Sequence, residues 1–202
     1  MELFETMRLD EGVFKRETYH FRRLKCASTA FNFDFNTVRW NEAITETASM
    51  LPTGTHRIKI RLNQKGTFHI EHAPLPKIEQ MTASLQQISS SIPSWQRIYK
   101  TTERDFLKHT HETQLILLYD ANEKILEFDI GNVVLEYEGQ CYTPNYENDF
   151  LRGCMRQSLL DQQKVTIQEI TLSTMKQILN QGGKLWMINS LRGWVPVKLI
   201  NL

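Results

Sequence analysis

The chain has 202 residues, of which 41% are hydrophobic and 23% are charged, and it contains 4 Trp, 6 Tyr and 10 Phe. This composition is typical of a folded globular protein and excludes a largely disordered chain. With 24 basic and 23 acidic residues the formal net charge is +1. The chain therefore has no overall electrostatic attraction to nucleic acid or to an anionic membrane.

Targeting and metal-binding signals are absent from the sequence. The strongest apolar run, residues 115–119, is far shorter than the roughly 20 residues of a spanning helix. The N-terminal Met-Glu-Leu-Phe-Glu-Thr lacks the basic and apolar regions of a signal peptide. The three cysteines, Cys26, Cys141 and Cys154, are scattered and form no zinc-like cluster. We expect a reduced cytoplasmic protein with no membrane, nucleic-acid or metal partner.

The first part of the chain predicts a hairpin followed by two helices. Residues 2–9 and 13–14 flank a turn at Asp10-Glu11-Gly12, so two paired strands are expected. An amphipathic helix follows with Thr18 as its cap, and a second helix begins after Asn36 and ends at Pro52. The inner side of the first carries Phe21, Leu24, Ala27 or Ser28, and Phe31; that of the second carries Val38, Ala43, Ile44, Ala48 and Leu51.

Strands dominate the next segment. Residues 57–62 alternate strictly and predict a half-buried strand that pairs with residues 67–71, while 82–89 predict another strand. The polar stretch after it contains Pro93 and is interpreted as a linker, 91–96. This gives a smaller N-terminal α+β domain, 1–90, and a larger C-terminal α/β domain, 97–202.

The second half predicts a mixture of strands and helices without strict βαβ alternation, which indicates an α+β or mixed α/β fold. A helix is expected after Lys100, and another near Cys154. The remaining expected elements are strands at 115–119, 125–127, 133–137, 141–143, 165–170, 184–188 and 195–200, and a helix at 173–180.

Several residues are candidates for chemistry, although the standard GxSxG, HExxH, P-loop and GxGxxG motifs are all missing. Arg23 borders an apolar helix stripe and could reach a cleft, or lie on the surface with a packed stem. Lys100 could act as a nucleophile or base, or be an ordinary solvated lysine. Glu127 ends an apolar strand, where it needs a partner unless it faces water.

The sequence has only 9 glycines and no glycine-rich phosphate loop, so an anion would have to bind elsewhere. Exposed N–H groups at a helix start or a polar turn can bind one, and two polar turns are candidates. One is the loop 151–156, which leads into a helix, and the other is 189–193. Each turn alone is more often a simple connection. His109 and His111 are two residues apart and are interpreted as surface residues rather than a metal pair.

The order of these motifs carries more information than any one of them. It runs Phe4-Glu5-Thr6-Met7-Arg8, His20-x-x-Arg23-Leu24, a mid-chain lysine, Glu127-x4-Asn132, Thr143-Pro144, Leu151-x-Gly153-x-x-Arg156 and Asn189-Ser190-Leu191-Arg192-Gly193. Over residues 3–198 it resembles the class IV (fold type IV) pyridoxal-phosphate enzymes. That family includes branched-chain aminotransferases, D-amino-acid aminotransferases and 4-amino-4-deoxychorismate lyases.

The resemblance implies a role for each matched residue. Lys100 matches the lysine that bonds covalently to pyridoxal 5'-phosphate, and Glu127 matches the carboxylate at its ring nitrogen. Arg23 matches the phosphate-binding arginine, and Asn132 would hold the loop that presents Glu127. The backbone N–H groups of the two phosphate-binding turns match Cys154, Met155, Ser190 and Leu191.

The resemblance also implies a two-domain fold of the D-amino-acid aminotransferase type, a small-molecule substrate and a homodimer. Relative to the usual pattern the chain is shortened by about twenty residues before Phe4. The 189–193 turn looks most like that of aminodeoxychorismate lyase, which makes 4-aminobenzoate and pyruvate on the way to folate. A branched-chain or D-amino-acid aminotransferase and a non-catalytic relative remain as alternatives.

A dicarboxylate substrate would need cationic side chains. Candidates are Arg57, with Lys59 and Arg61 on the same strand face, and more weakly Arg192 and Arg8. The alternative for the strand residues is a solvated face that binds nothing.

Overall fold

The computed structural model describes residues 1–200 and divides into two compact units. The first unit consists of Met1–Lys77 and Tyr99–Glu103, and the second of Ile78–Ile98 and the chain from Arg104 onward. No helix among the described residues is long and apolar enough to cross a membrane.

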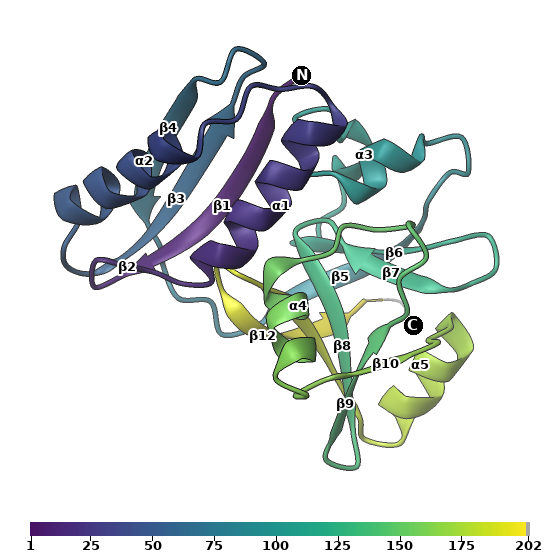
Figure 1. Ribbon diagram of the computed structural model, residues 1–202. Helices are drawn as coiled ribbons and strands as arrows, with labels where there is room; N and C mark the ends of the chain where they lie inside the picture. Colours follow the sequence, from purple (N-terminus) through teal and green to yellow (C-terminus); the bar gives the residue numbers. More distant parts are fainter. Residues whose placement is uncertain (201–202) are drawn as a thin grey trace. The chain divides into compact units, whose positions relative to one another are not determined.

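The first unit is a four-stranded antiparallel sheet in the order β2-β1-β3-β4, with both of its helices packed on one face (Figure 1). Its elements are β1 (Leu3–Asp10), β2 (Val13–Phe14), α1 (Glu17–Ala30), α2 (Thr37–Met50), β3 (Thr55–Leu62) and β4 (Phe68–Pro74). Strict alternation in β1 and β3 buries every second side chain against the helices. The fully buried residues of this core include Leu3, Met7, Leu9, Trp40, Ile58, Ile60 and Leu62.

The starts of the two helices differ. The Asn36 side chain caps α2 by accepting hydrogen bonds from the N–H groups of Val38 and Arg39, as the sequence predicts. Helix α1 begins one residue before the predicted cap Thr18, after Arg16 in a left-handed conformation, and has no side-chain cap. Val38 is 63% exposed rather than inward-facing, because Trp40 sets the buried stripe of α2 about 200° away around the helix.

The second unit is an eight-stranded sheet whose order is β10-β9-β8-β11-β12-β5-β6-β7, and β7 pairs again with β8. That last pairing closes six strands into a barrel. Parallel pairs join β12 to β5 and β5 to β6, while the other pairs within the barrel are antiparallel. The strands are β5 (Met81–Gln87), β6 (Leu115–Tyr119), β7 (Ile125–Phe128), β8 (Gly131–Tyr137), β9 (Gln140–Pro144), β10 (Thr166–Gln168), β11 (Lys184–Asn189) and β12 (Gly193–Leu199).

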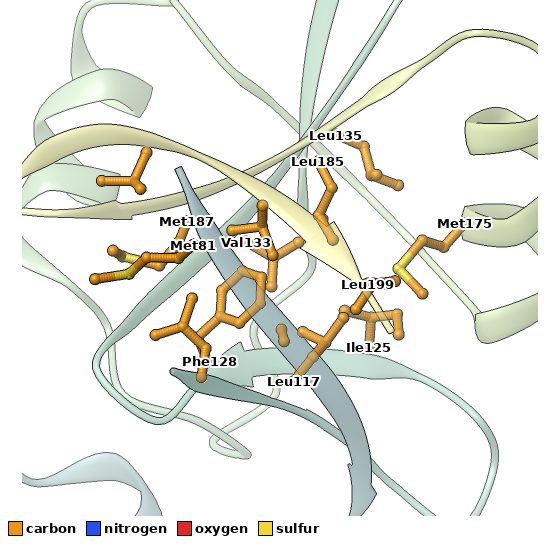
Figure 2. Packing of buried hydrophobic residues seen from close by; sticks show 14 of the residues in the cluster. Met81, Leu117, Ile125, Phe128, Val133, Leu135, Met175, Leu185, Met187 and Leu199 are labelled. Carbon is orange, nitrogen blue, oxygen red and sulfur yellow. The ribbon is translucent and has the colours of Figure 1, made fainter. Parts of the chain in front are cut away.

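The inward-facing side chains of these strands form one buried hydrophobic cluster (Figure 2). Phe128, Val133 and Met187 are fully buried in it. Helix α5 (Leu172–Asn180) contributes Met175 to the same cluster. Helix α4 (Cys154–Asp161) instead packs Met155 and Leu159 on the outer face of β8 and β11. The barrel is thus a rigid frame for the residues at its strand ends.

Three sequence expectations need correction. The boundary predicted near residue 90 lies earlier, because β5 pairs with β12 and β6 and so belongs to the second unit. The predicted linker 91–96 overlaps a short helix, α3 (Ser94–Ile98). The helix expected after Lys100 is only a single 3-10 turn, Asp105–Leu107.

Candidate active site

A buried acid holds the predicted phosphate-binding arginine in the first unit. Glu5 lies on the buried face of β1 and is 1% exposed. Arg23 Nε donates to Glu5 Oε1 at 2.8 Å, and its Nη2 donates to Oε2 at 2.5 Å. His20 Nδ1, one helical turn before Arg23, lies 2.7 Å from Oε2. This bidentate pair fixes the direction of the guanidinium and uses two of its five N–H donors.

The charge states of this cluster follow from its burial and pairing. Burial alone would raise the pKa of Glu5, but the Arg23 guanidinium and the His20 ring lower it to about 2. Burial lowers the pKa of His20, although Glu5 acts in the opposite direction. At neutral pH the cluster therefore consists of the Glu5 carboxylate, the Arg23 guanidinium and a neutral His20 imidazole. The carboxylate favours the cationic form of Arg23.

We expect the Glu5 carboxylate to stabilise the fold most strongly at neutral pH. Its pKa in the folded state, about 2, lies below the ordinary 4.5, so the stabilisation is full above pH 4.5 and is lost as the pH falls toward 2. The cost of Glu5→Gln in unfolding free energy should fall by about 3 kcal/mol over that range. Urea unfolding at a series of pH values measures it, with the exposed Glu42→Gln as control. A Glu5→Gln cost that is constant with pH would contradict the assignment.

Lys100 continues the first unit along the start of β1. The N–H of Phe4 donates to the Lys100 carbonyl at 3.0 Å, and Leu3 forms a bridge with Thr101. The Lys100 ammonium lies 4.6 Å from the centre of the Phe4 ring. The backbone at this lysine is therefore held by β1, and the half-buried side chain packs on an aromatic face.

Glu127 lies in β7 of the second unit, with 5% of its side chain exposed. Arg104 Nη2 donates to Glu127 Oε1 at 2.8 Å, and the arginine side chain is itself 8% exposed. A carboxylate at the end of a fully buried strand is costly without such a partner. The sequence reading identified Glu127 but gave Arg104 no role.

Asn132 organises the first predicted anion-binding turn. Its Nδ2 donates to the Leu151 carbonyl at 2.9 Å, and its Oδ1 accepts from the Gly153 N–H at 3.0 Å. The side chain thus holds the loop that leads into α4, and not a loop that presents Glu127 as we expected. Glu127 is its cross-strand neighbour in β7. Gly153 precedes α4 without a side-chain cap, so Cys154 and Met155 open the helix with amides that suit an anion.

Gly153→Ala should disrupt this loop, because an added Cβ would lie 2.0 Å from Asn132 Oδ1. Displacing the buried amide breaks both of its hydrogen bonds, and we expect a loss of about 2 kcal/mol in unfolding free energy. The control is the same substitution in an Asn132→Ala background, where the obstacle is already gone and the added cost should be small. Equal costs of Gly153→Ala in both backgrounds, measured by urea unfolding, would contradict the role of Asn132.

The second predicted turn is shaped by its own first residue. Asn189 Oδ1 accepts from the N–H groups of Leu191 and Arg192 at 3.1 and 2.7 Å. The Leu191 amide, which we expected to bind phosphate, is therefore engaged by Asn189. Ser190 is 7% exposed at the tip of the same turn. The turn is rigid and ordered by an Asx-type side chain, a feature that the sequence signals through Asn at its first position.

Four of the cationic candidates for substrate binding lie on the face of the first sheet that points away from its helices: Arg8, Arg57, Lys59 and Arg61. Arg8 lies directly opposite Arg57, and Thr6 lies opposite Lys59. Arg8 pairs with Asp10 at 3.2 Å, and Arg61 pairs with Glu2 and Glu71. Within residues 1–200, Arg57 and Lys59 take part in no ion pair with a carboxylate. Arg192, in the second unit, lies on the turn ordered by Asn189.

The acid that orients Arg23 could have been found from the sequence. Glu5 alternates with Leu3, Met7 and Leu9, so it is a charged residue on the inner face of a strand and requires a buried partner. Arg104 gave no comparable signal, because its partner is 23 positions away. Arg156 is also buried and orients a segment of the site. It donates to the Thr143 hydroxyl and the Pro144 carbonyl, and these bonds hold α4 against β9.

Comparison with known proteins identifies the family and the fold. A family model described as amino-transferase class IV matches residues 2–200. A protein of Schizosaccharomyces pombe with a provisional assignment as an aminodeoxychorismate lyase is 25% identical over 201 residues. The match covers 94% of this chain and 86% of that protein.

Two solved structures show the same fold. One is a provisionally assigned amino-acid aminotransferase from Mesorhizobium loti, with a TM-score of 0.85 and 24% identity, covering 98% of this chain and 99% of that one. The other is a provisionally assigned 4-amino-4-deoxychorismate lyase from Haemophilus somnus, with a TM-score of 0.80 and 22% identity, covering 95% and 97%. The predicted fold type IV architecture is thereby confirmed. Since the family model spans nearly the whole chain, this protein belongs to the class IV aminotransferase family, whose members depend on pyridoxal 5'-phosphate.

Proposed function

We propose that this protein is an aminodeoxychorismate lyase, which converts 4-amino-4-deoxychorismate to 4-aminobenzoate and pyruvate. The observation that carries the proposal is the near full-length match to the fission-yeast protein with that provisional assignment. The cationic sheet face of the first unit supports it, because this substrate carries two carboxylates.

The residues present fit the chemistry of pyridoxal phosphate. Its phosphate needs cationic and N–H donors, which Arg23 and the uncapped start of α4 supply. Its ring nitrogen needs an acid, which the buried Glu127 supplies. Its aldehyde needs a primary amine, which Lys100 supplies. When bound, the cofactor provides an electron sink for the electrons released at the carbon next to the substrate nitrogen.

Each of these side chains has a defined task in the proposed reaction. Lys100 Nζ removes the proton from the ring carbon that bears the amino group. The neighbouring C–O bond then breaks with its electron pair leaving on oxygen, the ring becomes aromatic, and the released enolate takes up a proton at its methylene carbon to become pyruvate. Glu127 would balance a positive charge at the ring nitrogen. Arg23 in the first unit and the α4 amides in the second are the donors that would serve the phosphate. Arg57 and Lys59 are the cations we assign to the substrate carboxylates, with Arg8 and Arg192 as further candidates.

A class IV aminotransferase is the second candidate, because the fold is shared with proteins assigned to that activity. The two reactions differ in what happens to the amino group: a transaminase leaves it on the cofactor, whereas a lyase returns it with the product. We expect no pyridoxamine phosphate when the cofactor-loaded protein is incubated with branched-chain amino acids, D-alanine or glutamate. Stoichiometric conversion, followed by absorbance and chromatography, would replace the lyase assignment with a transaminase.

The proposal includes a homodimer in the cytoplasm and a place in folate synthesis, as for the resembling enzymes. Gel filtration with light scattering tests the dimer, since a monomeric mass for the active protein would remove that part of the proposal.

A further inference from the structure

Arg104 is a buried arginine in contact with Glu127, the carboxylate assigned to the cofactor ring. Its Nη2 donates to Glu127 Oε1 at 2.8 Å, and both side chains are less than a tenth exposed. Both residues belong to the second compact unit, so the contact lies within one body. The pair is not explained by surface electrostatics, because water is excluded from both partners.

The guanidinium is fixed by more than the carboxylate. Arg104 Nε donates to the Gln96 carbonyl at 3.0 Å, and Nη2 donates to the Arg97 carbonyl at 3.3 Å. These carbonyls belong to the five-residue helix α3. The guanidinium also lies 5.4 Å from the centre of the Phe106 ring. Such a network allows one orientation of the planar group, which lysine with a single ammonium could not reproduce.

The carboxylate receives a defined direction from this contact. Glu127 belongs to a four-residue strand in which every position is buried, and it pairs across the sheet with Asn132. The bond from a fixed arginine to Oε1 restricts the directions that this buried carboxylate can take. A positive neighbour also favours the ionised form of an acid, and the ionised carboxylate can accept a hydrogen bond from a protonated ring nitrogen.

We propose that Arg104 is a positioning residue for Glu127: it fixes the direction of the carboxylate and keeps it ionised, so that the cofactor ring nitrogen meets it in one geometry. This inference rests on the proposed cofactor role of Glu127 and holds for a lyase and a transaminase alike. Arg104 would act on the reaction only through Glu127. A purely structural ion pair would change stability and leave the spectrum of the bound cofactor unaltered.

The test compares Arg104→Gln and Arg104→Lys with the wild-type protein after loading with pyridoxal phosphate. The first readout is the visible absorbance of the bound cofactor titrated with pH, and the second is kcat and KM separately. Removing a unit positive charge near the ring stabilises protonated forms, so the midpoint in Arg104→Gln should rise by about one pH unit. We expect kcat to fall at least about tenfold with KM within about threefold. Arg104→Lys keeps the positive charge but loses the planar group that fixes the Glu127 carboxylate, so a smaller midpoint shift in this variant reports the direction of the carboxylate alone.

Lys108→Gln is the matched control, because it removes one positive charge from the same segment at an exposed position. Its midpoint and kcat should equal those of the wild type. Arg104→Gln that folds and titrates like the wild type would overturn the inference while leaving the proposed function intact. Should Arg104→Gln fail to fold, Arg104→Lys decides, and an unshifted midpoint there overturns the inference. A wild-type protein with no cofactor absorbance at all would overturn both.

Discussion

Lys100→Ala is expected to fold normally and to lose both the covalent link to the cofactor and the reaction. The backbone contact between Phe4 and Lys100 uses the lysine carbonyl and survives the substitution. The substitution removes the ammonium from the Phe4 ring, a contact whose effect on stability is about 1 kcal/mol or less. Activity should fall at least about a thousandfold, because no other amine is assigned to the cofactor aldehyde or to the proton transfer.

Borohydride reduction followed by mass spectrometry measures the covalent link directly. The wild-type protein should gain the mass of one reduced cofactor, and a peptide digest should place it on Lys100. Lys65→Ala, at an exposed turn of the same unit, is the control and should behave like the wild type. A Lys100→Ala protein that still carries reduced cofactor, or turns over at the wild-type rate, would remove Lys100 from the site.

Glu127→Gln should reduce kcat at least about a hundredfold and also destabilise the second unit. The substitution leaves the buried Arg104 without an anionic partner, and breaking a buried ion pair costs about 3 kcal/mol or more when no acceptor replaces it. The Gln amide oxygen retains one acceptor, so we expect a loss of roughly 2 kcal/mol. Steady-state kinetics and urea unfolding separate the two effects, with the exposed Glu112→Gln as control. A stability loss without any loss of kcat would make Glu127 a structural residue only.

The sequence predicts most of the fold because its patterns are local. Strict alternation in β1 and β3, the cap at Asn36 and the turn before Val13 each depend on residues within a few positions of one another. The start of α1 was placed two residues late, because the left-handed conformation of Arg16, which takes the cap position instead of Thr18, has no sequence signature. The domain boundary was misplaced because β5 joins the second unit through pairing with β12, more than a hundred residues away.

The candidate site divides along the same line. Arg23, Lys100 and Glu127, the residues proposed to hold the cofactor, are predicted from the order of motifs. Of the groups that orient them, Glu5 is indicated by its position on the inner face of β1, whereas Arg104 is not indicated by any local pattern. Arg104 is held near Glu127 by its hydrogen bond to a carbonyl of α3, a contact that exists only in the folded protein. The partners of Asn132 depend on how α4 approaches β8, so the sequence indicates an organising asparagine without saying which loop it holds.

The most direct test of the proposed function follows both products of one reaction. Cofactor-loaded protein is supplied with chorismate, glutamine and a separate aminodeoxychorismate synthase, and 4-aminobenzoate and pyruvate are quantified together. The account predicts equimolar formation of the two products, dependent on this protein and abolished by Lys100→Ala. Loaded protein that carries the cofactor and forms neither product would contradict the lyase assignment.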